Sequence, residues 1–255
     1  MLIFIIILAG ISLGSFGNNI ISFFLGRAEF DLFRSRCFCG EKILKNYELI
    51  PIFSYVMLRG KCSGCERKIS ERYPLVEIFS GLLAFLSFIK YGLTTDFIFY
   101  FFLFYILLLI GVIDFYSYKI PNYLVLTILL IVLIKTALVE SLPLENLATS
   151  LTLIFIFIII NKLFRKIKDE EALGYGDVKL LSVLALAVNF PISVIGLWFS
   201  SLIAIPGFYL LKLTSKNIID NRKIPFGLFL SIGYVSTILL NQLIYAGLEY
   251  SLNYL

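Results

Sequence analysis

The chain has 255 residues, of which 60% are hydrophobic, and its mean hydropathy is +0.95. Soluble domains are about 45–50% apolar, so this composition excludes an ordinary soluble fold and predicts a membrane protein. The net charge of +5 does not indicate nucleic-acid binding, because the basic residues gather in loops between apolar runs.

Eight apolar runs are long enough to cross a bilayer, which takes about 20 residues per helix. The first run lacks the basic start and the short apolar core of a cleaved signal peptide, so we expect it to remain as a helix. The sequence therefore predicts an all-α, polytopic membrane protein with about eight transmembrane helices. The predicted spans are 2–26, 74–92, 97–114, 121–139, 145–162, 174–190, 192–211 and 225–248.

The basic residues test this number of crossings. Alternate crossings place four loops on one side of the membrane, and these loops, together with Lys162, hold 19 of the 22 Lys and Arg residues. By the positive-inside rule this side is cytoplasmic, so both termini are expected on the opposite side. The four loops are 27–73, 115–120, 163–173 and 212–224.

The first of these loops contains all four cysteines of the chain. Its second pair forms a CxxC sequence with Gly64 inside the turn, which is typical of half a zinc ribbon, whereas the first pair forms a less usual CxC. A reducing compartment disfavours disulfides. We predict a small zinc-ribbon-like cytoplasmic loop; the alternative is that the CxC pair does not complete tetrahedral geometry and the thiols bind no metal. The cysteines are Cys37, Cys39, Cys62 and Cys65.

Two aspartates at the ends of apolar runs are the candidate catalytic residues. Asp114 closes one run, and Asp177 opens another within the turn Gly174-Tyr-Gly176-Asp177. An ionisable group in a membrane helix is expensive and is therefore a candidate for function. The topology places both aspartates at the cytoplasmic ends of their helices, at one depth. Two carboxyls that share a proton are sufficient for an aspartic protease, although either aspartate alone is more often a hydrated interfacial residue.

The absence of histidine narrows the chemistry further. It excludes HExxH metalloproteases and proteases that use a Ser–His or Cys–His pair, so hydrolysis would use carboxylates or, as a less favoured alternative, a Ser–Lys or Cys–Lys pair. In a carboxyl dyad, one ionised Asp activates water and one protonated Asp acts on the carbonyl. Asp177 lies in a first helical turn and Asp114 in a last turn, so the helix dipoles predict Asp177 as the resting base and Asp114 as the resting acid.

Two other function classes remain open from these residues alone. A transporter or channel could use paired acids as a proton relay, but it would more often hold them at the midplane in broken helices of repeated halves, and no repeat is visible. A non-catalytic scaffold that binds zinc would depend on its cysteines and would tolerate substitution of both aspartates.

Six segments of the chain, in order, resemble motifs of the bacterial prepilin peptidases, also called type IV leader peptidases, which are aspartyl membrane proteases with a GxGD motif. The resemblance covers almost the whole chain, and the cysteine pairs lie where the family has its own. One departure is the first pair, which is CxC where the family normally has CxxC. The segments are GSFGNNIISF (14–23), NYELIPIFSYVMLRGKC (46–62), RYPLVEIFSG (72–81), IDFYSYKIPN (113–122), GYGDVKLL (174–181) and IPFGLFLSIG (224–233).

The resemblance implies a membrane aspartyl endopeptidase of the bacterial inner membrane. Its members remove the basic leader of type IV prepilins or pseudopilins at the cytoplasmic face, and many then methylate the new N-terminal residue with S-adenosylmethionine. The expected partners are such precursors and the lipid bilayer, without nucleic acid. By motif, the resemblance implies that Asp114 and Asp177 are catalytic and that Cys37, Cys39, Cys62 and Cys65 bind structural zinc.

The predicted topology divides the chain into three parts. These are a first transmembrane helix (1–26), a cysteine-containing loop domain (27–73) and a seven-helix catalytic membrane domain (74–255). Glu77, near the start of the second predicted helix, could serve methyl transfer, but we favour a role in capping and pairing at that helix.

Overall fold

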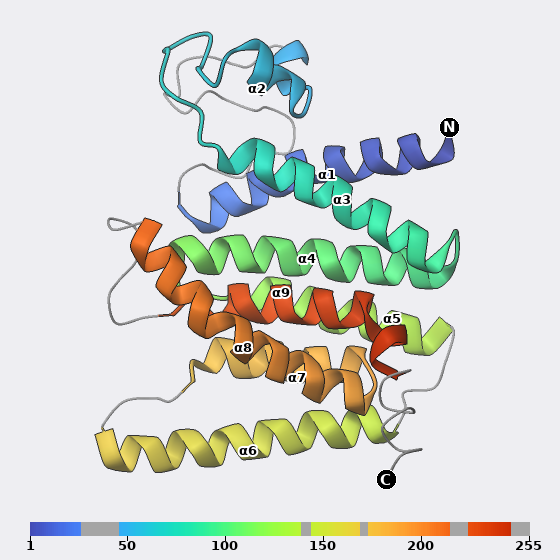
Figure 1. Cartoon of the computed structure of the whole chain (residues 1–255), viewed down its shortest axis with the longest axis vertical. Coiled ribbons are helices and arrows are strands. Elements are labelled where there is room, and N and C mark those ends of the chain that lie inside the picture. The colour runs from blue at the N-terminus through green and yellow to red at the C-terminus, as the bar shows by residue number, and fades with distance from the viewer. Residues whose placement is uncertain (27–45, 139–143, 169–172, 215–223, 246–255) are drawn as a thin grey trace. The chain divides into compact units, whose positions relative to one another are not determined.

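The computed structural model describes residues 1–26, 46–138, 144–168, 173–214 and 224–245. Within these ranges the regular elements are helices, and the only β pairing is an isolated bridge between Lys61 and Lys68. The elements are α1 (Leu2–Phe24), η1 (Asn46–Leu49), α2 (Phe53–Met57), α3 (Arg72–Tyr91), α4 (Thr95–Ser117), α5 (Asn122–Leu138), α6 (Leu144–Lys168), α7 (Tyr175–Ala187), α8 (Phe190–Thr214) and α9 (Phe226–Leu239) (Figure 1).

A helix lies in each of the eight predicted runs, and the all-α prediction is confirmed for the described residues. By length and composition, the helices α1, α3, α4, α6 and α8 can cross a membrane, so the chain is a multi-pass membrane protein. The other three are shorter, with 17 residues in α5, 13 in α7 and 14 in α9. The prediction of eight crossings is therefore not confirmed.

The shortness of α7 has local causes at both of its ends. The backbone of Gly174 is extended just before the helix, and Val188 is extended just after it, ahead of Pro191. At 1.5 Å per residue, α7 is about 20 Å long, whereas the hydrocarbon core of a bilayer is about 30 Å thick. Hydropathy places the beginning of this run at 174 but does not reveal the break at Val188, because Val188 and Phe190 are apolar.

The chain forms two compact units, Met1–Leu109 and Ile110–Leu255. In the N-terminal unit, α1 and α3 lie side by side (Figure 1). Their backbones approach closely at glycines: a Cβ on Gly10 would lie 2.7 Å from the Cβ of Ala84, and one on Gly14 would lie 2.7 Å from the Cα of Glu77. Such small-residue contacts are typical of membrane helices, where packing replaces the hydrophobic driving force.

Polar side chains fix the segment that precedes α3. The buried carboxylate of Glu77 accepts the backbone N–H of Ile52 at 2.7 Å, so Glu77 joins this segment to α3. The expected pairing role of Glu77 is thus present. At the end of α1, Asn18 donates to the carbonyl of Tyr73 at 2.9 Å, and Arg72 donates to Ser22 at 2.7 Å.

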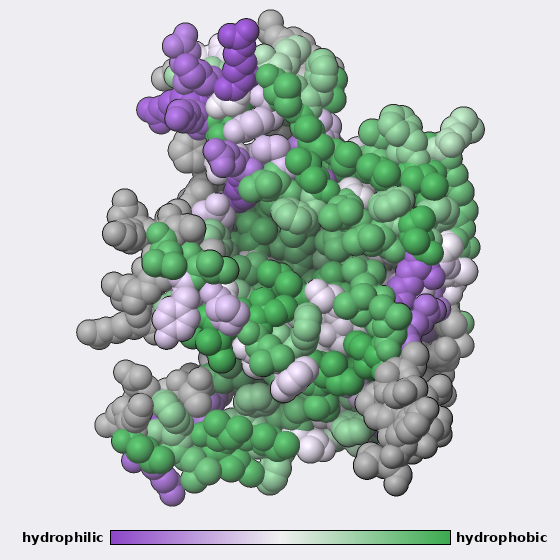
Figure 2. Space-filling view, viewed as in Figure 1, coloured by the Kyte–Doolittle hydropathy of each residue, from purple (hydrophilic) through white to green (hydrophobic). Residues whose placement is uncertain are grey.

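The surface of the molecule separates into apolar and polar regions. Figure 2 shows mostly apolar residues over the helices, and strongly hydrophilic residues over the segment that contains α2. Many large apolar side chains of the long helices are exposed, including Phe155 and Trp198. A lipid environment accounts for this exposure, since soluble monomers rarely carry such extensive apolar surface.

In the C-terminal unit, α6 packs on α7 and α8 packs on α9. Side chains of α6 reach the backbone of α7: Asn146 donates to the carbonyl of Leu186 at 3.2 Å, and Ser150 donates to that of Ser182 at 2.8 Å. These contacts hold α7 in place although its own length is small.

Substitution of Gly14 by Leu should destabilise the N-terminal unit, because the new side chain collides with the backbone of α3. We expect a loss of about 1–3 kcal/mol, seen as a lower melting temperature of the purified protein in detergent. Ser12→Leu is the matched control, since Ser12 lies on the exposed face of α1. Equal melting temperatures for the Gly14 and Ser12 variants would contradict the close α1–α3 contact.

Candidate active site

Asp114 lies in the last turn of α4, and its carboxyl group faces the beginning of α9. The side chain is only 5% exposed. Its Oδ2 accepts a hydrogen bond from the backbone N–H of Leu228 at 3.1 Å, and the N–H of Gly227 also lies within reach of this carboxylate. Since α9 begins at Phe226, the carboxylate occupies the N-terminus of that helix, where free N–H groups and the helix dipole favour an anion.

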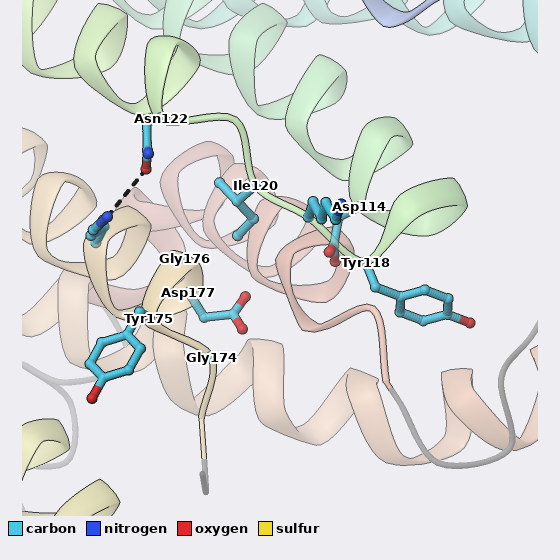
Figure 3. A pocket seen from close by; sticks show the side chains of 10 residues that line it. Asp114, Tyr118, Ile120, Asn122, Gly174, Tyr175, Gly176 and Asp177 are labelled. Atoms are coloured by element: carbon cyan, nitrogen blue, oxygen red, sulfur yellow. Dashed lines mark hydrogen bonds between the residues drawn. The ribbon is translucent and has the colours of Figure 1, made fainter. Parts of the chain in front are cut away.

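Asp177 lies in the first turn of α7 and lines the same cavity as Asp114. The cavity has a volume of about 400 Å³, and Figure 3 shows both carboxyl groups directed into it. Both aspartates belong to the C-terminal unit. The two candidates are therefore brought together, although 62 positions separate them in the sequence. The cavity is lined by Asp114, Tyr118, Lys119, Ile120, Asn122, Gly174, Tyr175, Gly176, Asp177 and Lys179.

Ile120 packs against one glycine in the first turn of α7 and another in the first turn of α9. A Cβ on Gly176 would lie 3.2 Å from the Cβ of Ile120, and a Cβ on Gly227 would lie 2.9 Å from its Cδ1. The Gly227 Cβ would also lie 3.0 Å from Oδ2 of Asp114. The missing side chains thus let α7 and α9 approach the loop after α4 and bring the two carboxyls into one cavity.

A hydrogen bond also joins this loop to α7. Lys179 donates from Nζ to Oδ1 of Asn122 at 3.3 Å, as the dashed line in Figure 3 marks. Asn122 is the first residue of α5, and Lys179 lies two residues after Asp177. The loop 118–121 is therefore held at one end by α4 and at the other by this contact.

The predicted roles of the two aspartates are not supported by this geometry. That prediction considered only the helix to which each aspartate belongs, and it made Asp177 the base. Asp114 lies in the last turn of its own helix, as predicted, but its carboxylate receives hydrogen bonds at the start of α9. Such hydrogen bonds favour the ionised form, so Asp114 becomes the better candidate for the base. The sequence signal for this contact was the segment IPFGLFLSIG, whose place in space was not predictable.

The second cysteine pair lies in a tight turn. The N–H of Gly64 donates to Sγ of Cys62 at 3.4 Å, and the N–H of Cys62 donates to the carbonyl of Arg67 at 2.9 Å. A tight CxxC turn of this kind fits half of a zinc site. Cys37 and Cys39 lie outside the described residues. Among the residues that the structure describes, no cluster of three or more metal-binding side chains occurs.

Two family models match the chain. The "Bacterial Peptidase A24 N-terminal domain" matches residues 8–91, and the "Type IV leader peptidase family" matches residues 101–209. Both aspartates that line the cavity are covered by the second match, which ends before α9. No solved structure matches the chain significantly.

Curated relatives cover most of the chain. A "Prepilin leader peptidase/N-methyltransferase" of Pseudomonas putida is 31% identical over 210 residues, which are 82% of this chain and 72% of the relative. A protein of the same name from Stutzerimonas stutzeri is 31% identical, over 88% of this chain and 78% of the relative. Another, from Pseudomonas aeruginosa, is 32% identical, over 84% of this chain and 73% of the relative.

Infrared difference spectra of the carboxyl groups should show which aspartate carries the proton at neutral pH. We expect Asp177→Asn to remove a protonated-carboxyl band that Asp114→Asn retains, because backbone N–H groups hold the Asp114 carboxylate. If Asp114→Asn removes the band and Asp177→Asn does not, the assignment of Asp114 as the base, which rests on its hydrogen bonds from α9, is wrong.

Proposed function

Because the chain belongs to the type IV leader peptidase family, we propose that it removes the leader of type IV prepilins or pseudopilins at the cytoplasmic face of a bacterial inner membrane. That the chain is a peptidase follows from the family. The observation that carries the proposal is the cavity in which Asp114 and Asp177 meet. Paired carboxyls at one cavity are the groups that aspartic proteolysis needs, and a chain without histidine offers no common alternative base.

In the proposed mechanism, Asp114 is the base and Asp177 the acid. The Asp114 carboxylate takes a proton from water as the water oxygen adds to the carbonyl carbon, while Asp177 gives its proton to the carbonyl oxygen. In the second step, Asp177 recovers a proton from one hydroxyl of the tetrahedral intermediate. The proton on Asp114 goes to the leaving nitrogen, and the C–N bond breaks. Both carboxyls then return to their starting states.

The proposed topology places the cavity near the cytoplasmic surface. The basic loops support this orientation, because they lie at the end of the predicted spans where Asp114 and Asp177 are found. All eight helices are proposed to lie in the membrane, with the shorter α5, α7 and α9 packed among longer ones. The cysteine-containing loop 27–73 is proposed as a separate cytoplasmic domain, and 74–255 as the catalytic one.

Methyl transfer and a structural zinc site also enter the proposal. The relatives' name supports methylation of the new N-terminal amine with S-adenosylmethionine as methyl donor. Structural zinc is proposed at Cys37, Cys39, Cys62 and Cys65, on the basis of the turn at the second pair. When bound, the metal would join the two cysteine pairs and hold a loop that has little core of its own.

Substitution of either aspartate should abolish cleavage of a prepilin-like peptide by the purified enzyme. Asp114→Asn removes the base and Asp177→Asn the acid, so we expect the rate to fall by at least about 10²-fold in each. Mass spectrometry with and without S-adenosylmethionine reports leader loss and methyl gain separately. Asp96→Asn, at the other end of α4, is the control that should retain activity. Full cleavage by either active-site variant would rule the mechanism out.

Metal analysis of the purified protein should find about one zinc ion per chain. Cys62→Ser and Cys65→Ser should release it, because each removes a thiolate, and Cys37→Ser and Cys39→Ser should do the same if the CxC pair takes part. The Asp114→Asn variant should keep its zinc, because Asp114 belongs to the C-terminal unit and the cysteines to the N-terminal unit. Unchanged zinc content after substitution of all four cysteines would disprove the proposed site.

A further inference from the structure

Asn161 is a buried amide in the apolar helix α6, with an exposed fraction of 5%. Its Nδ2 donates to the carbonyl of Leu173 at 2.8 Å, and its Oδ1 accepts the N–H of Leu173 at 2.9 Å. A single side chain therefore satisfies both backbone groups of one residue. A polar side chain in an apolar helix is costly unless it is paired, and among the described residues the partner of this one is the backbone of Leu173.

Leu173 immediately precedes the Gly174 turn that leads to Asp177. Gly174 adopts an extended conformation (φ −62°, ψ 141°) and is the N-cap of α7. A Cβ on Gly174 would lie 3.1 Å from Oδ2 of Asp177, so the backbone at this turn lies against the carboxyl. Fixing Leu173 therefore fixes the entry of the chain into α7, and with it the position of the Asp177 carboxyl.

A second contact of α6 reaches the same turn. Arg165 lies one helical turn after Asn161, and its Nη2 donates a hydrogen bond to the hydroxyl of Tyr175 at 3.4 Å. Tyr175 lines the cavity. The opposite end of α6 offers a comparison: Asn146, with 6% exposure, makes one hydrogen bond to the carbonyl of Leu186, near the far end of α7. Both asparagines join α6 to the α7 segment, but only Asn161 acts next to Asp177.

We propose that Asn161 is a positioning residue of the active site, which holds the backbone before the Gly-x-Gly-Asp turn so that the Asp177 carboxyl faces Asp114 across the cavity. This inference rests on the proposed function for its kinetic consequences. A carboxyl that moves by about 1 Å can reduce a catalytic rate about 10²-fold without weakening substrate binding.

The test compares Asn161→Leu with Asn146→Leu in the full-length enzyme. Both remove a buried amide that joins α6 to the α7 segment, so a purely structural role predicts similar effects. We expect kcat for prepilin-peptide cleavage to fall about 10²-fold in Asn161→Leu with KM unchanged, and to stay near wild type in Asn146→Leu. Asn161→Asp keeps the size and the acceptor but loses the Nδ2 donor. Its kcat should fall about tenfold, which keeps the test valid if Asn161→Leu does not fold.

An infrared measurement separates this inference from the proposed function. The protonated-carboxyl band of the aspartate pair should shift in both Asn161 variants and stay unchanged in Asn146→Leu. If the wild type cleaves no prepilin, the proposed function fails, but the band comparison still decides the role of Asn161. Wild-type kcat in the Asn161 variants, an equal loss in Asn146→Leu, or an unshifted band would overturn the inference.

Discussion

The hydrogen bond from the backbone of Leu228 to the carboxylate of Asp114 is the contact on which the rest of the site depends. It joins the end of α4 to the beginning of α9 and supplies, from backbone alone, the positive environment that a buried anion requires. Neither the water nor the substrate has to provide this stabilisation. In the proposed mechanism, the Asp114 carboxylate is ionised before the substrate arrives and can therefore act as the base without first losing a proton to solvent.

Close backbone approach brings the second aspartate to the first. Gly176 and Gly227 lie against Ile120, and a methyl group at either position would press on the Ile120 side chain and, at Gly227, also on the carboxyl of Asp114. In a membrane, lipid surrounds apolar side chains as readily as other helices do, so small residues and polar contacts decide which helices meet. The absence of side chains at these glycines and the hydrogen bond between Lys179 and Asn122 therefore help to shape the cavity.

Much of this arrangement follows from the sequence, but some of it could not. The apolar runs and the two aspartates at their ends were sufficient to predict the helices, a membrane protein and two of the residues that line the cavity, Asp114 and Asp177. The short length of α7 was not predictable from hydropathy, because apolar residues continue through the break before Pro191. The roles of the aspartates were predicted from single helices, whereas Asp114 receives its hydrogen bond from a helix more than 100 positions later in the sequence, and this contact favours the opposite assignment. Nothing in the sequence distinguishes Asn161, and only its pairing with Leu173 in the structure shows that it contacts the segment before α7.

The most direct test of the account is chemical cross-linking between the two aspartate positions. In a chain whose four natural cysteines are replaced by serine, Asp114→Cys and Asp177→Cys place two thiols at the cavity, and dibromobimane fluoresces when it bridges a close pair. We expect strong fluorescence from this pair and little from Asp114→Cys combined with Ser182→Cys, which is more than one helical turn further along α7. Equal, weak fluorescence from both pairs in folded protein would show that the two carboxyls do not share one cavity.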